Sequence, residues 1–357
     1  MSKVLFLLRI CTNFFTFFLF YFLFLDPVKK LVNRFEFSNC YDQSSTQAEI
    51  FGQEIRDLVL EVFNGVTSSI FTFGCTGSGK TYTLQGVPAD PGIVPRTAKE
   101  IFDHIHRLEK LDGLSPSVQP VAPQHIVSVS CFEIWKDKVW DLLSESTSSK
   151  DLGRGDLSIR ETSEGHIFIP NLCHHPVKNL KDFEKLYSRV TKYRATSSTK
   201  LNHLSSRSHA ILNIHVTQIR DGIKYEGKCV LIDLAGSENN KNTGNEHSKE
   251  RMKESVEINQ SLLALRKVVK ALDSGDTRIP YRDSKLTRIL SDSLGGTSSA
   301  LVICNITPNP SQYRDTINTL TFGSYSRNVE NKVVHREKEY RRSLFFFFFF
   351  FFFRKKG

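Results

Sequence analysis

The stretch "FGCTGSGKTYTLQG", residues 73–86, decides the fold. Residues 74–81 match the pattern G-x-x-x-x-G-K-[ST]; the apolar run before them predicts a strand, and "TYTLQG" predicts the start of a helix. Glycines in such a loop let backbone N–H groups turn towards phosphate oxygens, and the helix N-terminus adds its positive dipole end. The alternative is a chance glycine-rich turn, and the strand–loop–helix context argues against it.

The loop therefore predicts a phosphate site with defined chemistry. Lys80 is expected to reach the β- and γ-phosphates, and the Thr81 hydroxyl to ligate Mg²⁺. Tyr82 either lies against a nucleobase or is an ordinary core aromatic, and both readings stay open. The predicted nucleotide-binding residues are Gly74, Cys75, Thr76, Gly77, Ser78, Gly79, Lys80, Thr81 and Tyr82.

The rest of the chain favours ATP as the nucleotide. A GTPase is expected to carry N-K-x-D, and "NKNT" at 240 and "NKVV" at 331 both lack the aspartate. The H-R-D and D-F-G motifs of protein kinases are absent as well.

The periodicity between the ends of the chain predicts an α/β layered domain. Further strands are predicted at 125–135, with "KDKVWDLL" continuing the first of them, and at 210–219, 228–236 and 299–308. Apolar residues at three- and four-residue steps predict an amphipathic helix at 253–275. Strands that alternate with helices indicate a mostly parallel central sheet with helices on both faces.

Composition limits the class of partner and the compartment. Among 357 residues, Lys and Arg number 48 against 38 Asp and Glu, and the net charge of +10 favours an acidic partner. The seven cysteines form no C-x-x-C pair, which suits a reducing interior. "Cys-His-His" at 173–175 lacks a second ligand pair at zinc-site spacing, so a strand and turn is favoured there.

Both ends are unusually apolar. Residues 4–25 contain a clean apolar run of only 12 residues, from 14 to 25, and 345–353 is an unbroken phenylalanine tract. Both uninterrupted runs are shorter than the ~20 residues that a spanning helix needs. Counted from Val4, the first segment has 22 residues, which is enough to span but places Arg9 inside. We favour the interpretation that both ends are non-coding sequence carried into the reading frame; a membrane anchor and a hydrophobic interaction segment are the alternatives.

Two further segments narrow the class of nucleotide-binding protein. "NHLSSRSH" (202–209) precedes a predicted strand, and "LIDLAGSE" (231–238) ends one in a D-x-x-G turn. Two such loops sense the γ-phosphate in nucleotide switches. With the phosphate loop, these motifs resemble the kinesin motor domain, from about residue 35 to about residue 331. The resemblance implies a three-layer P-loop NTPase that hydrolyses ATP with Mg²⁺.

The resemblance also implies roles for single residues. Ser206 should meet Mg²⁺ and the γ-phosphate, and Asp233 should support the metal through water. The Gly236 amide should sense the γ-phosphate. Arg207 and Glu238 should form a salt bridge that closes the site and helps align the attacking water; the alternative is an ordinary surface pair.

A basic segment, "RIPYRDSKLTRILSDSLGG" (278–296), resembles the kinesin loop and helix that touch the microtubule. Tubulin is acidic on its outer surface, which implies contact through positive charge; the alternative is a solvated helix face. Asn259 begins the family's relay helix, which is the candidate two-state coupling element. The predicted microtubule-binding residues are Arg278, Arg282, Lys285 and Arg288.

The chain also departs from the family pattern. No Arg-x-Arg-Pro element is present, so the first strand region is expected to be missing and the adenine to lose its clamp. Arg266 stands where the family usually has glycine in its relay helix. Residues 243–286 most resemble the Kid-like chromokinesin branch. No DNA-binding tail and no heptad run follow, so nucleic acid cannot be assigned and the oligomeric state stays open.

These observations support a kinesin-like motor domain at 31–335, between an apolar segment at 1–30 and a basic, phenylalanine-rich tail at 336–357. The expected function is a microtubule-stimulated motor ATPase that couples ATP hydrolysis to movement or force along microtubules. It is expected in the cytoplasm, on the microtubule cytoskeleton and the spindle. The alternative is a non-motile microtubule-binding module with an impaired nucleotide site. A third hypothesis, a membrane-anchored protein, requires the hydrophobic ends to be genuine.

Overall fold

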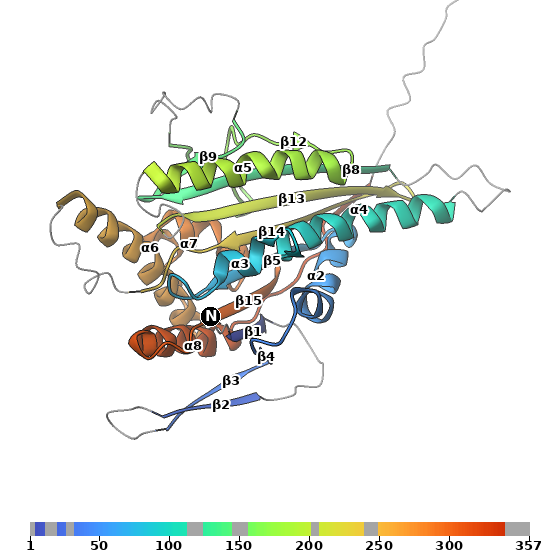
Figure 1. Cartoon of the computed structure of the whole chain (residues 1–357). Helices are drawn as coiled ribbons and strands as arrows, with labels where there is room; N and C mark the ends of the chain where they lie inside the picture. Colours follow the sequence, from blue (N-terminus) through green and yellow to red (C-terminus); the bar gives the residue numbers. More distant parts are fainter. Residues whose placement is uncertain are drawn as a thin grey trace, which may run out of the picture.

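A computed structural model gives the fold of the chain (Figure 1). It describes the backbone of residues 4–10, 20–25, 32–112, 124–144, 156–200, 207–238 and 249–339. Side chains are described in 34–110, 124–144, 156–195, 207–238 and 260–339. Ser206 and the phenylalanine tract at 345–353 lie outside these ranges.

A 10-stranded sheet forms the centre of the described part of the chain. Eight of its strands run in the spatial order β12 (His175–Pro176), β8 (Gln124–Trp135), β13 (His209–Arg220), β14 (Ile223–Asp233), β5 (Thr67–Phe73), β15 (Ser299–Ile306), β1 (Val4–Ile10), β4 (Asn39–Tyr41). Two more, β9 (Lys138–Asp141) and β16 (Glu337–Glu339), pair with β8 and β14. Each strand predicted from the sequence is present, and 175–176 is a strand as favoured.

The sheet is mixed, so the expectation of a mostly parallel sheet is wrong. Among the described strands, β5 runs parallel to β14 and β15, and the other pairings are antiparallel. Two-residue turns with positive φ account for two of the antiparallel pairs. One, at Lys136 and Asp137, reverses the chain between β8 and β9, so "KDKVWDLL" forms a second strand and does not continue the first. The other, at Asp221 and Gly222, joins β13 to β14.

The expectation that the first strand is missing is also wrong. Strand β1 lies antiparallel to β15, with Val4 opposite Ile306 and Ile10 opposite Ala300, and β4 pairs with its other edge. Backbone pairing needs an extended chain and not the absent proline or arginines, and an apolar run suits a position inside a sheet. Strands β1 and β16 lie outside 31–335 and still pair with the sheet, so the domain boundaries remain a prediction.

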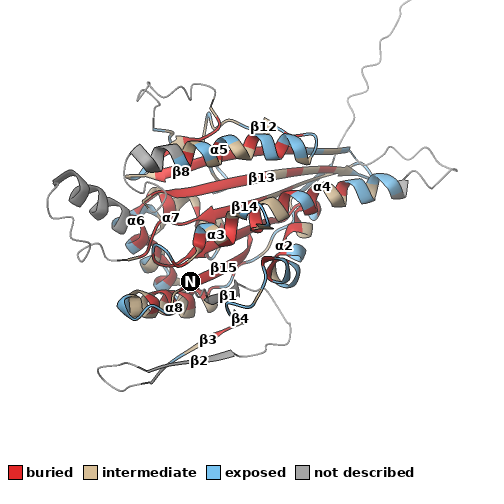
Figure 2. Cartoon of the chain, in the orientation of Figure 1, coloured by how far each residue is buried: buried red, intermediate tan, exposed pale blue. Residues whose placement is uncertain are grey.

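Helices cover both faces of the sheet, giving three layers (Figure 1). One face carries α2 (Arg56–Glu61), α3 (Lys80–Gln85), α4 (Ile93–Asp112) and α5 (Leu180–Lys200); the other carries α6 (Lys249–Asp273), α7 (Lys285–Ile289) and α8 (Tyr313–Arg327). The period of two along each strand produces two cores. In β14, Leu231 packs into the first core, and its neighbours Val230 and Ile232 pack into the second. Figure 2 shows β5 and β15 buried along their whole length and β13 and β14 buried over much of theirs.

Short elements complete the described chain. Helix α6 begins at Lys249, ten residues before Asn259. None of the described helices is long and apolar enough to cross a membrane. The remaining strands and α-helix are the antiparallel pair β2 (Phe20–Leu25) and β3 (Val32–Phe37), α1 (Gln47–Ile50), β6 (Gly86–Val87) with β7 (Asp90–Pro91), and β10 (Arg160–Glu161) with β11 (Ile167–Phe168). The other short elements are a π-helix at Phe51–Ile55 and 3-10 helices at Val62–Asn64, Tyr281–Asp283, Ser291–Ser293 and Pro310–Gln312.

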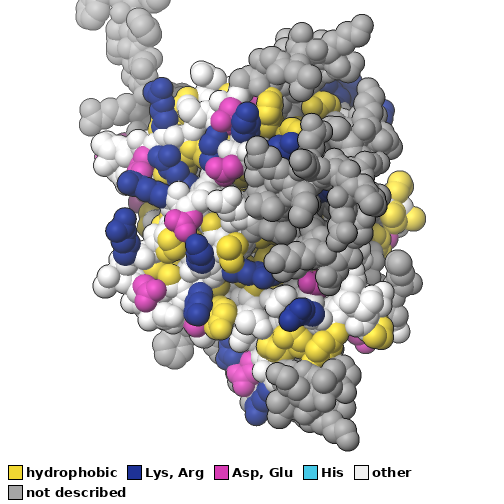
Figure 3. Space-filling model, turned by 90° about the vertical axis from the view of Figure 1, so that its left-hand side faces the viewer, with side chains coloured by type: hydrophobic (Ala, Val, Ile, Leu, Met, Phe, Trp, Pro, Cys, Tyr) yellow, Lys and Arg dark blue, Asp and Glu magenta, His cyan; other side chains and the backbone are white. Residues whose placement is uncertain are grey.

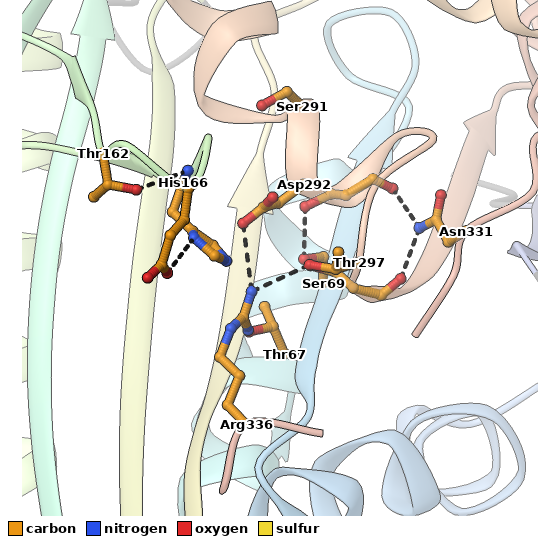
Figure 4. A network of polar contacts seen from close by, with 12 residues as sticks. Thr67, Ser69, Thr162, His166, Ser291, Asp292, Thr297, Asn331 and Arg336 are labelled. Carbon is orange, nitrogen blue, oxygen red and sulfur yellow. Dashed lines mark hydrogen bonds and ion pairs between the residues drawn. The ribbon is translucent and has the colours of Figure 1, made fainter. Parts of the chain in front are cut away.

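The segment after α8, residues 328–339, crosses the end of the sheet and is held by two side chains (Figure 4). The buried Asn331 amide donates to the carbonyl oxygens of Ser293 (3.0 Å) and Ser298 (2.7 Å). Arg336 donates to the Thr67 hydroxyl and lies 3.6 Å from an Asp292 carboxylate oxygen. These contacts place β16 beside β14.

Gly65 gives a test of this attachment. It has φ +78°, and a Cβ there would lie 2.4 Å from the Arg336 carbonyl oxygen. Gly222 has φ +73° with nothing within 4 Å of its Cβ position. Both Gly→Ala changes cost the left-handed strain of about 1–2 kcal/mol, and Gly65→Ala is expected to cost about 1–3 kcal/mol more, from overpacking. Urea unfolding measures the free energy of unfolding of the two variants. Equal losses in Gly65→Ala and Gly222→Ala would contradict the packing of the 328–339 segment against Gly65.

Candidate nucleotide site

The loop at 74–79 joins the end of β5 to the start of α3, as the sequence predicts. Gly79 has φ +106° and precedes the helix, a conformation that strongly favours glycine. A Cβ at Gly74 would lie 2.1 Å from the Asn305 carbonyl oxygen of β15, so this position also needs glycine. The loop is thus a tight backbone cradle at the N-terminus of a helix, the arrangement that binds phosphate.

Lys80 places its amine inside this cradle. Its side chain is buried, and Nζ donates to the carbonyl oxygens of Gly74 and Cys75, each at 2.9 Å. Burial lowers the pKa of Lys80, and the Asp233 and Glu238 carboxylates oppose that shift. Because both acceptors are neutral carbonyls, phosphate oxygens would be stronger partners for the ammonium group.

The residues predicted to serve a metal meet beside the loop. The Thr81 hydroxyl donates to Oδ2 of the buried Asp233 at the end of β14 (3.1 Å). Hydroxyl and carboxylate oxygens are the donors that Mg²⁺ prefers, so the two residues present fit that ion. Ser206, the third predicted residue, lies outside the described part of the chain.

The loop after β14 lies directly on the phosphate loop. Ser237 N–H donates to the Gly74 carbonyl oxygen (3.0 Å). The Glu238 carboxylate accepts from the Thr76 backbone N–H (2.8 Å) and from the Thr76 hydroxyl. A Cβ at Gly236 would lie 2.3 Å from both Glu238 Oε2 and Thr76 Oγ1, so a side chain at this position would push the Glu238 carboxylate off Thr76. Among the ion pairs of the described residues, none joins Glu238 to Arg207, so their salt bridge remains a prediction for another state of the loop.

Two residues at the site were not predicted. Arg194 of α5 is buried, and its Nη1 lies 3.2 Å from Asp233 Oδ2. Burial lowers the pKa of Arg194, but the Asp233 and Glu133 carboxylates outweigh this effect and raise the pKa above its usual value.

The second residue, His209, is the last residue of the "NHLSSRSH" motif and connects β13, the loop after β14 and α6. Its position in that motif was a usable signal, whereas nothing in the sequence around Arg194 distinguishes it from other helix arginines.

The tautomer of His209 follows from its contacts. Its Nδ1 accepts from Ala235 N–H (3.1 Å), so the proton lies on Nε2, which donates to the Ser261 hydroxyl of α6 (2.9 Å). Burial, with the Lys80 and Arg194 charges, lowers the pKa of His209 to about 3, so the ring is neutral near pH 7. His209 therefore ties the loop after β14 to α6 through a fixed neutral ring.

Tyr82 and Cys75 are the remaining side chains of interest in the loop. Tyr82 is half-buried, and its hydroxyl donates to Asp90 Oδ2 (3.2 Å), which places it at the surface beside β7 and outside both cores. Its contact with adenine remains a prediction. Burial raises the pKa of the Cys75 thiol to about 11, which keeps it a thiol.

The basic residues at 278–288 fall into two pairs. Arg278 and Arg282 are exposed, and Arg282 Nη2 lies 3.9 Å from a Glu161 carboxylate oxygen. Lys285 and Arg288 are partly buried, and Lys285 Nζ lies 2.6 Å from Asp156 Oδ2. Arg278, Arg282 and Arg288 line a cavity of about 930 Å³ beside the end of α6. Figure 3 shows Lys and Arg side chains spread over the described part of the face it presents, with Asp and Glu among them.

Comparison with known proteins gives one consistent result. The model of the family described as "Kinesin motor domain" matches residues 26–329. The chain is 40% identical to "Kinesin-like protein KIF22" of Danio rerio, over 85% of this chain and 46% of the relative. It is 37% identical to "Kinesin-like protein KIN-10C" of Oryza sativa subsp. japonica, over 84% of this chain and 46% of the relative. The chain thus spans less than half the length of the curated relatives it matches.

Solved structures agree with the fold. The chain resembles a structure titled "Structure of a fast kinesin", with a TM-score of 0.76 and 32% identity, over 87% of this chain and 84% of that one. It also resembles a KIF14 dimer solved with AMP-PNP in complex with a microtubule, with a TM-score of 0.77 and 29% identity, over 88% and 89% of the two chains. The three-layer fold is therefore that of a P-loop motor domain, and the chain belongs to the kinesin family.

Proposed function

We propose that this chain hydrolyses ATP with Mg²⁺ and couples the reaction to movement along microtubules. The observation that carries the proposal is the direct contact between the phosphate loop and the loop after β14, made by Ser237 and by Glu238. A third phosphate that reaches Gly236 would displace or rearrange this contact, so its presence can be transmitted to the rest of the molecule.

The chemistry of the cradle supports a triphosphate as that group. Lys80 supplies a buried positive charge, and Thr81 with Asp233 supplies oxygen ligands for Mg²⁺, which together neutralise charge on transferring phosphoryl groups. Ser206 completes the metal site in the proposal. Phosphoryl transfer asks the protein mainly for positioned charge and excluded water, and these residues lie where they can supply both.

The loop after β14 then acts as the sensor. The Gly236 amide donates to the third phosphate, and Glu238 leaves Thr76 to pair with Arg207, which closes the site around the attacking water. Because Glu238 is held on Thr76 in the structure, this movement exchanges two hydrogen bonds for one ion pair. Helix α6 follows the loop and is connected to it by the hydrogen bonds of His209 to Ala235 and Ser261. In the proposal, α6 transmits the movement of the loop to the microtubule-binding surface.

Microtubules are the proposed partner, with the cytoplasm and the spindle as the site of action. The net charge of +10 favours an acidic polymer. The exposed Arg278 and Arg282 lie just beyond the end of α6 and can meet a partner directly. Lys285 pairs with Asp156, and Arg288 lies near Glu161. Their charges are therefore partly neutralised within the chain, and their direct contribution to binding should be smaller than that of Arg278 and Arg282. Nucleic acid and membranes have no part in the proposal, and the oligomeric state is left open.

The test is ATP turnover by the full chain with and without microtubules. We expect turnover to rise when microtubules are added and to fall back as salt screens the contact. Arg278→Glu with Arg282→Glu should weaken microtubule affinity by about tenfold or more and leave turnover without microtubules unchanged, because long-range attraction is reversed while the cradle is intact.

Arg189→Glu is the matched control, since Arg189 is exposed on α5, in the layer on the opposite face of the sheet. It should bind microtubules as the unchanged chain does. Binding without stimulated turnover would favour the non-motile module with an impaired nucleotide site, and the absence of ATP turnover and microtubule binding together would refute the proposal.

A further inference from the structure

Arg266 occupies an unusual place on α6. The helix packs its apolar side into the second core, and Arg266 lies among those core residues, with Leu265 before it and Val268 after it buried. Its Nη2 donates to the Ser237 carbonyl oxygen at 3.3 Å, and its Nε is buried without a hydrogen-bond partner among the described residues. A guanidinium group placed here loses part of its hydration. Its hydrogen bond to the Ser237 carbonyl oxygen offsets some of that cost.

The guanidinium group also touches the base of the phosphate loop. Its Cζ lies 5.7 Å from the centre of the Phe73 ring, the last residue of β5 before the loop. The Phe73 ring stacks on Phe322 of α8 with the ring centres 4.0 Å apart. Burial lowers the pKa of Arg266, and the Asp315 carboxylate of α8 opposes that shift. Arg266 is thus held between α6, β5 and α8.

The peptide that Arg266 contacts is itself part of the site. Ser237 N–H donates to Gly74 in the phosphate loop, and its carbonyl oxygen accepts from Arg266 on the other side. The next residue, Glu238, covers the Thr76 N–H. The three contacts together hold the loop at 236–238 down against the cradle.

We infer that Arg266 is a positioning residue that favours the arrangement in which Glu238 covers Thr76, and so sets how strongly the site prefers a triphosphate over a diphosphate. The inference rests on the proposed function, in which the third phosphate meets Gly236 and displaces this loop. A ligand shifts such an equilibrium only by its differential affinity for the two arrangements. The contact from Arg266 therefore opposes binding of the triphosphate and leaves the diphosphate unaffected.

The experiment measures affinities for ADP and AMP-PNP, with Mg²⁺ and without microtubules, by calorimetric titration of the full chain. Arg266→Met keeps the length and packing of the side chain and removes its donors. We expect the ratio of AMP-PNP affinity to ADP affinity to rise by about 10- to 100-fold, the order of the factor that one hydrogen bond from a charged donor carries. Arg266→Lys retains a charged donor, and its ratio should fall between the two.

Lys270→Met is the matched control, because Lys270 lies about one turn further along α6 and is exposed. Its ratio should equal that of the unchanged chain. An unchanged ratio in Arg266→Met, or a parallel fall of both affinities, would overturn the inference by showing a purely structural role. If Arg266→Met does not fold, Arg266→Lys decides by the same ratio. A wild-type chain that binds neither nucleotide would instead refute the proposed function and the inference with it.

Discussion

Lys80→Ala is expected to reduce ATP turnover by more than about 100-fold, the size of effect seen when one preorganised donor is removed from a transition state. The Lys80 amine is buried between two loop carbonyl oxygens, and burial lowers its pKa, so the fold holds a charge where it is costly. A negative ligand that enters the cradle relieves this cost, and alanine removes that source of binding and of charge neutralisation. Steady-state turnover with and without microtubules measures the effect.

Lys99→Ala is the control for that experiment, because Lys99 is exposed on α4 and pairs only with Asp103 one turn away among the described residues. Its turnover should match that of the unchanged chain. Thermal melting of Lys80→Ala should show a folded protein, since the change removes a buried charge and opens no large space in either core. Undiminished turnover in Lys80→Ala would mean that the phosphates bind elsewhere.

Arg194→Leu is expected to destabilise the chain by about 3–5 kcal/mol, the usual cost of leaving one member of a buried ion pair uncompensated. Arg194 and Asp233 are both buried, with Nη1 and Oδ2 3.2 Å apart. Leucine fills much of the space but leaves the Asp233 carboxylate with only the Thr81 hydroxyl among the side-chain contacts found between described residues. Urea unfolding measures the loss.

Arg56→Leu is the comparison for Arg194→Leu. Arg56 also pairs with a buried carboxylate, that of Glu100, but its side chain is 52% exposed, and Arg107 stays 2.8 Å from the same carboxylate. A loss within about 1 kcal/mol is expected. Equal losses of unfolding free energy in the two variants would show that burial does not determine how much the Arg194–Asp233 pair contributes to stability.

Local pattern was enough for much of the fold. The strand at 69–74, the phosphate loop and the helix after it follow from an apolar run, glycine spacing and a helix start, each of which acts within a few residues. The strands at 210–219, 228–236 and 299–308 are equally local. Whether each strand runs parallel or antiparallel to its neighbours cannot be predicted locally, because it depends on which strands become neighbours. The positive-φ turn at Asp221 and Gly222 is the local signal that was available for one antiparallel pair.

Some residues of the candidate site could be predicted from a short segment of sequence, and others depend on contacts between distant segments. The residues of the phosphate loop could be named from the sequence because one short segment holds them all. Arg194 and Arg266 could not be given roles, because each acts on a residue about 30 to 40 positions away, Asp233 and Ser237. The pairing of Glu238 with Thr76 is likewise decided by two loops that meet only after folding.

By itself, then, the sequence determined the chemistry of this protein: a glycine loop that needs unusual φ angles, a lysine and a threonine at its end, and two polar motifs that each precede or follow a strand. Those properties depend on near neighbours in the chain. The tertiary structure alone decided the mixed sheet with Val4–Ile10 as one of its strands, the burial of Arg194, and the contact of the 236–238 loop with the cradle and with Arg266. The reason is that burial and charge pairing depend on which distant segments share a core, and only packing of the whole chain fixes that.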